Sequence, residues 1–464
     1  MKTNVKPAQL KTHEGGVAKH INPELQLRRS VMSCMLWEGE FYESGESIAK
    51  RIAETIPKVD PEKVAQIAIE AREQMKLRHV PLLIVREMAR LPEHKKFVAE
   101  TLYRIIQRAD ELAEFVSIYW KDGKQPLSAQ VKKGLAKAFT KFNEYALAKY
   151  NRDGAVKLRD VLFLCHAAPT GIEQAELWKR LIDGTLATPD TWEVSLSDSN
   201  DKRSKKEKWE TLLKENKLGA LALLRNLRNF GQESVDDDLV IKALKEVKVQ
   251  RVLPFRFIAA ARYAPHFEPY IEEAMLKCLE SNEKMYGHTV ILIDVSCSMD
   301  AKISGKSDIT RLDAACGVAM LLREICDRID IYSFSTKLKQ IPARRGFALR
   351  DAIVNSQTHG GTPLGEAIKC IYAPKSYKLG VQSMGCGNSY GEGYVGQELR
   401  PDRLIVITDE QGTGTTPNPT GKGYMINVAS SRNGVGYGPW AHVDGWSEAV
   451  VNYIQAFESF SVEE

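Results

Sequence analysis

The chain has 464 residues, which is more than one ordinary hydrophobic core accommodates, so two or more domains are expected. Its 43% hydrophobic and 27% charged residues are typical of a soluble globular protein, and no apolar run is long enough for a transmembrane helix. The opening stretch, MKTNVKPAQLKTHEGG, lacks the apolar core of a secretory signal. Eight scattered cysteines without a CxxC pair favour reduced thiols in the cytoplasm over a disulfide framework or a zinc site.

The net charge of +5 is divided unevenly along the chain. Residues before Tyr286 include 48 basic and 41 acidic side chains, a net charge of +7, whereas the remainder has 17 and 19, a net charge of −2. The positive surplus therefore belongs to the first part of the chain. It fits an anionic partner such as nucleic acid, and it also fits a mildly basic solvated surface.

From about Ser44 to Ser281 the apolar residues recur with a helical period. A representative set has the spacing i, i+3, i+4 and i+7 of one helix face: Val64, Ile67, Ala68 and Ala71. Short amphipathic helices in series predict an α-solenoid of HEAT-like paired helices. No strict repeat is evident in the sequence, so an irregular helix bundle stays an alternative.

The pattern changes at Thr289, where the apolar β-branched run TVILID predicts a buried strand over Thr289–Asp294. Strands and helices then alternate, which predicts a parallel sheet covered on both faces. A glycine-rich insert at Gly380–Pro401 indicates a flexible loop. The further predicted elements are a helix at Arg311–Arg328, a strand at Asp330–Phe334, a helix at Leu349–Ser356, a helix after Gly361, strands at Arg403–Thr408 and Tyr424–Val428, and a closing helix at Trp446–Phe457.

Oxygen-bearing side chains follow the predicted strands at places that form the ligand crevice of an α/β sheet. The five residues are Asp294, Ser296, Ser298, Thr362 and Asp409. Two carboxylates and three hydroxyls, with no sulfur or imidazole, suit a hard divalent cation, and Mg²⁺ fits best. A DxSxS stretch by itself is more often a helix cap or a loop brace, but its conjunction with GGT and a strand ending in TD favours a metal site.

The strings LIDVSCSM, GGTPLGEA and VITDE resemble the metal-ion-dependent adhesion site of a von Willebrand factor A domain. The resemblance covers residues 286–464 and implies a doubly wound parallel sheet. It also implies that the five residues named above are the coordinating positions, and that the metal serves binding instead of catalysis.

The preceding region, residues 1–285, resembles the TROVE domain of Ro autoantigens and their bacterial relatives. The resemblance rests on LQLRRSVMSCMLWEGEFYESG, on LAKAFTKFNEYALAKYNRDGAVKLRDVLFLCHAAP, and on the later LALLRNLRNFG and VLPFRFIAA. It implies that the helices form a ring whose basic outer surface holds a small structured non-coding RNA of the Y RNA kind. The central hole would take the single-stranded 3′ end of misfolded RNA, as in non-coding RNA quality control.

The stretch from Lys132 to His166 is the richest in basic residues near aromatic ones. Lys133 and Lys137 share one helix face, and basic residues such as these would neutralise RNA phosphates unless they merely form a solvated face. His166 becomes a candidate because it matches the Leu-x-His position that contacts RNA in Ro proteins. The further candidates in this stretch are Lys149, Arg152, Lys157 and Arg159.

Two arginines later in the helical region are candidates for single-stranded RNA. Arg225 shares a helix face with Arg228, and Arg256 lies inside the apolar run LPFRFIAA. A half-buried arginine needs an acceptor, which is either a phosphate or an internal carboxylate, and the sequence leaves both open. In a ring, these helices could line the hole.

The sequence therefore favours a non-catalytic, monomeric RNA-binding scaffold with no membrane partner. The alternative is a metal-dependent protein-interaction module that recruits an RNA-processing partner, such as an exoribonuclease, through a carboxylate. An enzyme is disfavoured because no P-loop, no GxGxxG after a strand and no catalytic triad in its motif context is present.

Overall fold

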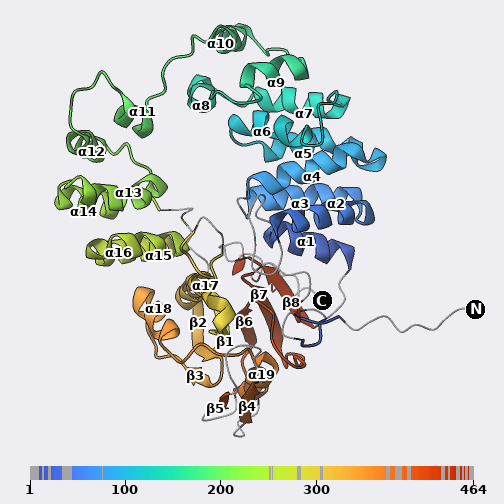
Figure 1. The fold of residues 1–464 in the computed structure, drawn as a ribbon, viewed down its shortest axis with the longest axis vertical. Helices are drawn as coiled ribbons and strands as arrows, with labels where there is room; N and C mark the ends of the chain where they lie inside the picture. Colours follow the sequence, from blue (N-terminus) through green and yellow to red (C-terminus); the bar gives the residue numbers. More distant parts are fainter. Residues whose placement is uncertain are drawn as a thin grey trace, which may run out of the picture. The chain divides into compact units, whose positions relative to one another are not determined.

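The computed structural model in Figure 1 describes most of the chain. The described residues are 10–12, 15–18, 22–33, 44–75, 77–249, 252, 254–279, 284–303, 307–372, 377–381, 389–393, 399–429, 434–436, 439–445, 450–451, 454 and 458. The chain divides into two compact units. The helical unit comprises Asn22–Trp37 and Gly45–Lys202, and the sheet-containing unit comprises Met1–Ile21, Glu38–Ser44 and Arg203–Glu464. The predicted domain boundary after residue 285 stays a prediction.

The helical unit is built from short helices in two rows. Helices α1, α3, α5, α7 and α9 contact one another in sequence, and α2, α4 and α6 form the second row. The bounds are α1 (Pro23–Ser33), α2 (Gly45–Thr55), η1 (Ile56–Lys58), α3 (Pro61–Glu73), α4 (His79–Arg90), η2 (Pro92–His94), α5 (Lys95–Ile105), α6 (Asp110–Tyr119), α7 (Ala129–Phe139), α8 (Glu144–Tyr150), α9 (Leu158–Cys165), α10 (Ile172–Asp183) and α11 (Trp192–Ser197). This regular stacking confirms the predicted solenoid.

The local sequence explains why these helices begin and pack where they do. The Asp60 side chain accepts hydrogen bonds from the backbone N–H groups of Glu62 and Lys63 and so caps the start of α3. All four predicted apolar residues of α3 are buried. In α7, a Cβ atom at Gly134 would lie 2.9 Å from the carbonyl oxygen of Ala99, so only glycine allows α7 and α5 to approach this closely.

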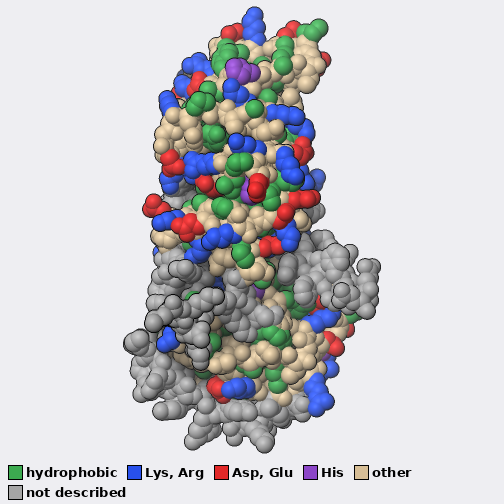
Figure 2. Space-filling view, turned by 90° about the vertical axis from the view of Figure 1, so that its right-hand side faces the viewer, with side chains coloured by type: hydrophobic (Ala, Val, Ile, Leu, Met, Phe, Trp, Pro, Cys, Tyr) green, Lys and Arg blue, Asp and Glu red, His purple; other side chains and the backbone are tan. Residues whose placement is uncertain are grey.

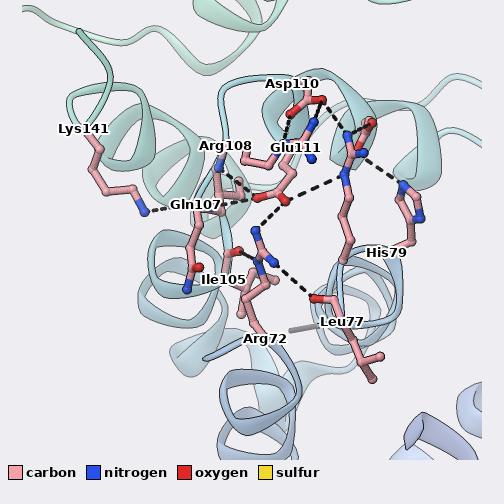
Figure 3. A network of polar contacts seen from close by, with 12 residues as sticks. Arg72, Leu77, His79, Ile105, Gln107, Arg108, Asp110, Glu111 and Lys141 are labelled. Atoms are coloured by element: carbon pink, nitrogen blue, oxygen red, sulfur yellow. Dashed lines mark hydrogen bonds and ion pairs between the residues drawn. The ribbon is translucent and has the colours of Figure 1, made fainter. Parts of the chain in front are cut away.

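A buried ion pair joins three helices inside the helical unit (Figure 3). Arg72 of α3 donates to Glu111 of α6 over 2.6 Å and to the carbonyl oxygen of Ile105, at the end of α5, over 2.9 Å. The second carboxylate oxygen of Glu111 accepts from the backbone N–H groups of Gln107 and Arg108. Every partner is hydrogen-bonded, which is the condition under which a buried charge pair is tolerated.

The sheet-containing unit begins with further helices that continue the same two-row packing. Helix α13 contacts α15, which in turn contacts α17, and α14 contacts α16. The bounds are α12 (Lys205–Lys214), α13 (Ala220–Gln232), α14 (Asp237–Glu246), α15 (Pro254–Tyr263), η3 (Pro265–Phe267) and α16 (Glu268–Leu279). None of the helices in the described part of the chain is long and apolar enough to cross a membrane.

The sheet has six strands in the order β3-β2-β1-β6-β7-β8, and every neighbouring pair is parallel except β2 with β3. Its strands and helices are β1 (Met285–Asp294), η4 (Cys297–Asp300), α17 (Arg311–Ile325), β2 (Cys326–Phe334), β3 (Leu338–Gln340), α18 (Gly346–Val354), α19 (Leu364–Tyr372), β6 (Arg403–Thr408), β7 (Lys422–Asn427) and β8 (Trp440–Asp444). Val290 and Leu292 of β1 pack with Ile368 of α19 on one face. Helix α17 contacts β1, where the alternate residues Ile291 and Ile293 are also buried. The predicted doubly wound α/β fold is confirmed.

Some predicted elements differ from the structure. The insert at Gly380–Pro401 was expected to be a loop, but strands β4 (Tyr377–Val381) and β5 (Ser389–Gly393) pair there as an antiparallel hairpin. The prediction was wrong because glycine-rich strands lack the apolar alternation that marks a strand in sequence. Strand β8 was not anticipated. The predicted closing helix at Trp446–Phe457 falls largely outside the described residues.

Candidate functional site

The five predicted metal ligands converge at one edge of the sheet. Strands β1 and β6 are parallel neighbours, so Asp294 at the end of β1 and Asp409 directly after β6 lie at the same edge. Three of the five side chains, those of Asp294, Ser296 and Asp409, belong to fully buried residues. Thr362 is 5% exposed in the loop before α19, and the hydroxyl of Ser298 lies 3.2 Å from that of Ser296.

Backbone hydrogen bonds tie the three ligand-bearing loops together. The Cys297 N–H donates to the carbonyl oxygen of Gly360 over 2.9 Å, which joins the DxSxS loop to the GGT loop. The Thr413 N–H donates to the carbonyl oxygen of Thr362 over 3.0 Å, which joins the GGT loop to the segment after Asp409. Main-chain hydrogen bonds therefore hold the three loops of the site together.

The two carboxylates of this edge are electrostatically coupled. Burial, and then the negative charge of Asp409, raises the pKa of Asp294 to about 7. Asp294 accepts hydrogen bonds from the Ser296 N–H over 2.9 Å and from the Thr408 hydroxyl over 2.6 Å. These hydrogen bonds lower the pKa of Asp294 and offset the increase only in part. Paired, buried carboxylates with adjacent hydroxyls are a donor set that a hard divalent cation would satisfy, so the residues fit Mg²⁺.

This donor set differs from that of a zinc or iron site. Among the residues that the structure describes, no three His, Cys, Asp or Glu side chains come together as a metal cluster. The candidate centre contains only two such residues and takes its other oxygens from serine and threonine. These oxygen ligands suit cations that accept neutral oxygen ligands and water.

An amino-terminal segment packs beside this edge and was not anticipated from the sequence. The Thr12 hydroxyl donates to the carbonyl oxygen of Gly412 over 3.1 Å, and the Val17 N–H donates to that of Gly414 over 3.2 Å. A Cβ atom at Gly16 would lie 2.4 Å from the Gly412 oxygen, which requires glycine at this contact. Thr12, Gly16 and Val17 thus brace the loop that follows Asp409.

A second candidate site is an arginine-lined pocket between α13 and α15, with a volume of about 330 Å³. Both helices contribute residues at the spacing i, i+3, i+4 and i+7, which places these four residues of each helix on one face. From α13 these are Leu221, Leu224, Arg225 and Arg228, and from α15 they are Arg256, Ala259, Ala260 and Tyr263; Asn229 also lines the pocket. The structure therefore brings the two predicted arginines, Arg225 and Arg256, together.

No carboxylate of the described residues forms an ion pair with the arginines of this pocket. The Arg256 guanidinium lies 4.9 Å from the Phe255 ring centroid, and that of Arg228 lies 5.9 Å from the Tyr263 centroid. Packed atoms around Arg256 and the charge of Arg225 lower the pKa of Arg256, although its side chain is exposed to solvent. An internal ion pair, the alternative left open by the sequence, is thus not what holds Arg256. The pocket is instead suited to an anion.

The basic residues of the helical unit are spread over its surface and mostly paired. Lys137 of α7 forms an ion pair with Glu100 over 2.7 Å and lies 4.2 Å from the Tyr103 ring centroid. Lys157 pairs with Asp153 over 2.6 Å, and Arg159 lies 4.0 Å from Asp160. In Figure 2, Lys and Arg side chains on the described part of one face are interspersed with Asp and Glu instead of gathering in one patch.

Other predicted RNA contacts lie on or directly after helices α7, α8 and α9. His166 ends α9 in a left-handed conformation with φ of 52°, and its Nε2 atom lies 3.3 Å from Lys132 Nζ. Lys133 is exposed on α7, and Lys149 lies 5.7 Å from the Tyr145 ring centroid. Arg152 lines a separate pocket of about 490 Å³ with Arg108, whose guanidinium lies 4.6 Å from the Tyr150 ring centroid. Lys132, Tyr103 and Arg108 were not among the predicted residues.

Comparison with known proteins finds a family model and a similar solved structure. Residues 179–289 match the model of the TROVE domain, a stretch that contains both helices of the arginine-lined pocket. No curated protein sequence matches the chain. The crystal structure of the Deinococcus radiodurans Ro (RSR) protein matches with a TM-score of 0.60 and 16% sequence identity, and the match covers 94% of this chain and 99% of that one. At this identity the likeness establishes the fold.

Proposed function

We propose that the chain is a non-catalytic RNA-binding scaffold, because residues 179–289 match the model of the TROVE domain and the chain has the fold of a bacterial Ro protein. In this proposal a small structured non-coding RNA of the Y RNA kind binds the basic outer surface of the helices. Single-stranded RNA 3′ ends bind in the hole of a ring that the helices would form. The protein would act as a cytoplasmic monomer in non-coding RNA quality control or processing.

The observation that carries the proposal is the arginine-lined pocket between α13 and α15. Three arginines with no acidic partner among the described residues surround a cavity of about 330 Å³. The exposed Tyr263, at 46%, and Leu221, at 49%, border the same cavity. Arginine forks bind phosphate bidentately and aromatic side chains stack on unpaired bases, which is the combination that single-stranded RNA needs.

A double substitution, Arg225→Gln with Arg256→Gln, tests this assignment. We expect it to weaken binding of a short single-stranded RNA by about ten-fold or more, because two charge-assisted contacts are lost. Lys242→Gln on α14 removes a charge from the same unit without touching the pocket and serves as the control. Equal losses in both variants would mean that the pocket does not hold RNA.

The outer surface needs its own test. Replacing Lys137 and Lys149 by glutamate should weaken binding of a stem-loop RNA, because each phosphate contact becomes a repulsion. The short single-stranded RNA should be affected much less. If the arginine pair and the lysine pair of substitutions weaken the binding of both RNAs in the same proportion, there are not two separate RNA sites. The two-site proposal would then be wrong.

The metal centre supports a second, compatible function. We propose that Asp294, Ser296, Ser298, Thr362 and Asp409 hold Mg²⁺, which supplies an electrophilic site for one further anionic ligand. The sheet domain would then capture a carboxylate of an RNA-processing protein, such as an exoribonuclease. The observation that favours this is the convergence of two buried carboxylates and three hydroxyl groups at one sheet edge.

A further inference from the structure

The arginine-lined pocket between α13 and α15 has more positive charge than one RNA phosphodiester neutralises. Among the described residues that line it, three are arginines and none is acidic. A guanidinium stays protonated at physiological pH, so the pocket has three positive charges. A phosphodiester within an RNA strand has a single negative charge, which leaves two of the three uncompensated.

The acidic side chains that contact α15 have partners of their own. Arg262, which does not line the pocket, donates to both carboxylate oxygens of Asp313, over 2.9 Å and 2.7 Å. Asp308 accepts a hydrogen bond from the Tyr263 hydroxyl and forms an ion pair with Lys302 over 2.8 Å. Within the described part of the chain, neither carboxylate forms an ion pair with an arginine of the pocket.

The three arginines come from two packed helices. Arg225 and Arg228 are one turn apart on α13, and Arg256 lies on α15, which contacts α13. Aromatic rings adjoin two of the guanidinium groups, 5.9 Å from the Tyr263 centroid for Arg228 and 4.9 Å from the Phe255 centroid for Arg256. Such contacts orient a guanidinium. An anion in the pocket therefore meets guanidinium groups of both helices.

A phosphate monoester matches this arrangement better than a diester does. At neutral pH a monoester has a charge of about −1.5 to −2 and three free oxygens. A diester has one charge and two free oxygens. Because an arginine fork binds two oxygens at once, the third oxygen allows three guanidinium groups to share one phosphate. In an RNA strand, only a terminal phosphate is a monoester.

The size of the pocket also favours the end of a strand. Its volume of about 330 Å³ is near the lower end of the range for small-ligand sites, which suits one nucleotide. The Tyr263 hydroxyl is bound to Asp308, so Tyr263 offers the pocket its ring, on which a base can stack.

We propose that this pocket recognises the terminal phosphate monoester of a single-stranded RNA and discriminates against an end that has only hydroxyl groups. The inference rests on the proposed function, since it specifies which RNA ends the pocket binds. Residues Arg225, Arg228 and Arg256 would determine this specificity.

The inference is tested with one short single-stranded RNA that has an internal fluorophore, by its anisotropy on titration with the full chain. The RNA is made with hydroxyl groups at both ends, with a 3′-phosphate, or with a 5′-phosphate. We expect at least one phosphate form to bind about ten-fold or more tightly than the hydroxyl form, because charge-assisted hydrogen bonds are gained. The form that gains identifies the end that is bound. The same RNA with a methyl ester on its terminal phosphate is the matched ligand control and should gain much less.

A single substitution, Arg256→Gln, leaves two arginines in the pocket, so that both forms of the RNA remain measurable. It should reduce the preference for the terminal phosphate by about three-fold or more, since one charge-assisted contact is lost. Arg344→Gln is the matched control. It makes the same replacement at an exposed position of the same unit, directly before Arg345 and outside the pocket, and should keep the preference. Circular dichroism verifies that both variants are folded.

The possible failures are distinguishable. No binding of any of these RNAs would overturn the proposed function, and this inference with it. Equal binding of the hydroxyl, phosphate and methyl-ester forms would overturn the inference alone. A preference that Arg256→Gln retains in full would also overturn it, because the phosphate would then bind elsewhere. If inorganic phosphate competes as well as the phosphorylated RNA does, the ligand is free phosphate and recognition of an RNA end is wrong.

Discussion

His94, at the end of η2, is 3% exposed, and its burial lowers the pKa of the imidazole. In the unfolded chain the imidazole has a pKa of about 6.5, so between the two values the unfolded state binds more protons than the folded state. Stability is therefore fully present above about pH 6.5 and is lost as the pH falls towards the lowered pKa of the folded state.

We predict that His94→Phe reduces the loss of stability between pH 7.5 and pH 5.5, measured by urea unfolding at each pH. Carboxylates that titrate in the same range are common to both proteins and cancel in the comparison. His166→Asn, at an exposed position that tolerates the left-handed conformation, is the control and should leave the pH dependence unchanged. Identical pH profiles for His94→Phe and the wild-type protein would show that burial of His94 has no effect on the titration.

Asp294 is the residue on which the metal proposal depends most directly. It is fully buried, and it lies at the end of β1 between Ser296 and Thr408. We predict that Asp294→Ala abolishes tight Mg²⁺ or Mn²⁺ binding in calorimetry, because a carboxylate ligand is lost. RNA binding by the helices should persist. Asp300→Asn, a more exposed carboxylate nearby, should bind the cation normally, and unchanged binding by Asp294→Ala would remove the basis of the metal site.

At the scale of elements, the ion pair between Arg72 and Glu111 holds α3, α5 and α6 together (Figure 3). We predict that Arg72→Leu lowers the free energy of unfolding by about 3–5 kcal/mol, because it leaves a buried carboxylate without its main partner. Arg104→Leu is the control, since its ion pair with Glu73 is exposed and should contribute about 0–1 kcal/mol. Chemical denaturation measures the free energy of unfolding of both variants. Equal losses of stability would show that burial does not increase the contribution of the ion pair between Arg72 and Glu111.

The predicted and observed elements also show where the spacing of apolar residues is sufficient to identify a strand or helix. Strand β6 covers Arg403–Thr408, as predicted, because a continuous run of buried apolar residues identifies a central parallel strand. Strand β3 has only three residues and was missed, since so short an edge strand has no measurable alternation. The predicted helix at Arg311–Arg328 ends earlier, at Ile325, because the chain enters β2 directly at Cys326.

At the scale of the whole molecule, the charge surplus of +7 before Tyr286 predicts that RNA binding is strongly salt-dependent. If roughly five to eight phosphates are neutralised, the logarithm of the binding constant should fall with a slope of about −4 to −7 against the logarithm of salt concentration. Filter binding or fluorescence anisotropy over a range of salt concentrations measures the slope. A slope near −1 would contradict an electrostatic RNA surface.

The sequence by itself determined the helical repeats, the central strands β1 and β6, and the order of the motifs that contain the proposed metal ligands. These properties depend on side chains within a single helix, strand or loop: the helical spacing around Val64, the apolar run before Asp294, and the oxygen side chains that follow it. Local chemistry is sufficient for them because the neighbours that matter are only a few residues apart in the chain.

Only the tertiary structure decided which distant residues meet. Arg225 and Arg256 line one pocket because α13 packs against α15. Arg311 lies beside Asp409, 98 residues later, because α17 begins near the sheet edge at which β6 ends. The sequence likewise could not reveal that Arg256 has no ion-pair partner among the residues that the structure describes, while Lys137 pairs with Glu100. Such pairings depend on how helices and strands pack, which no local pattern encodes.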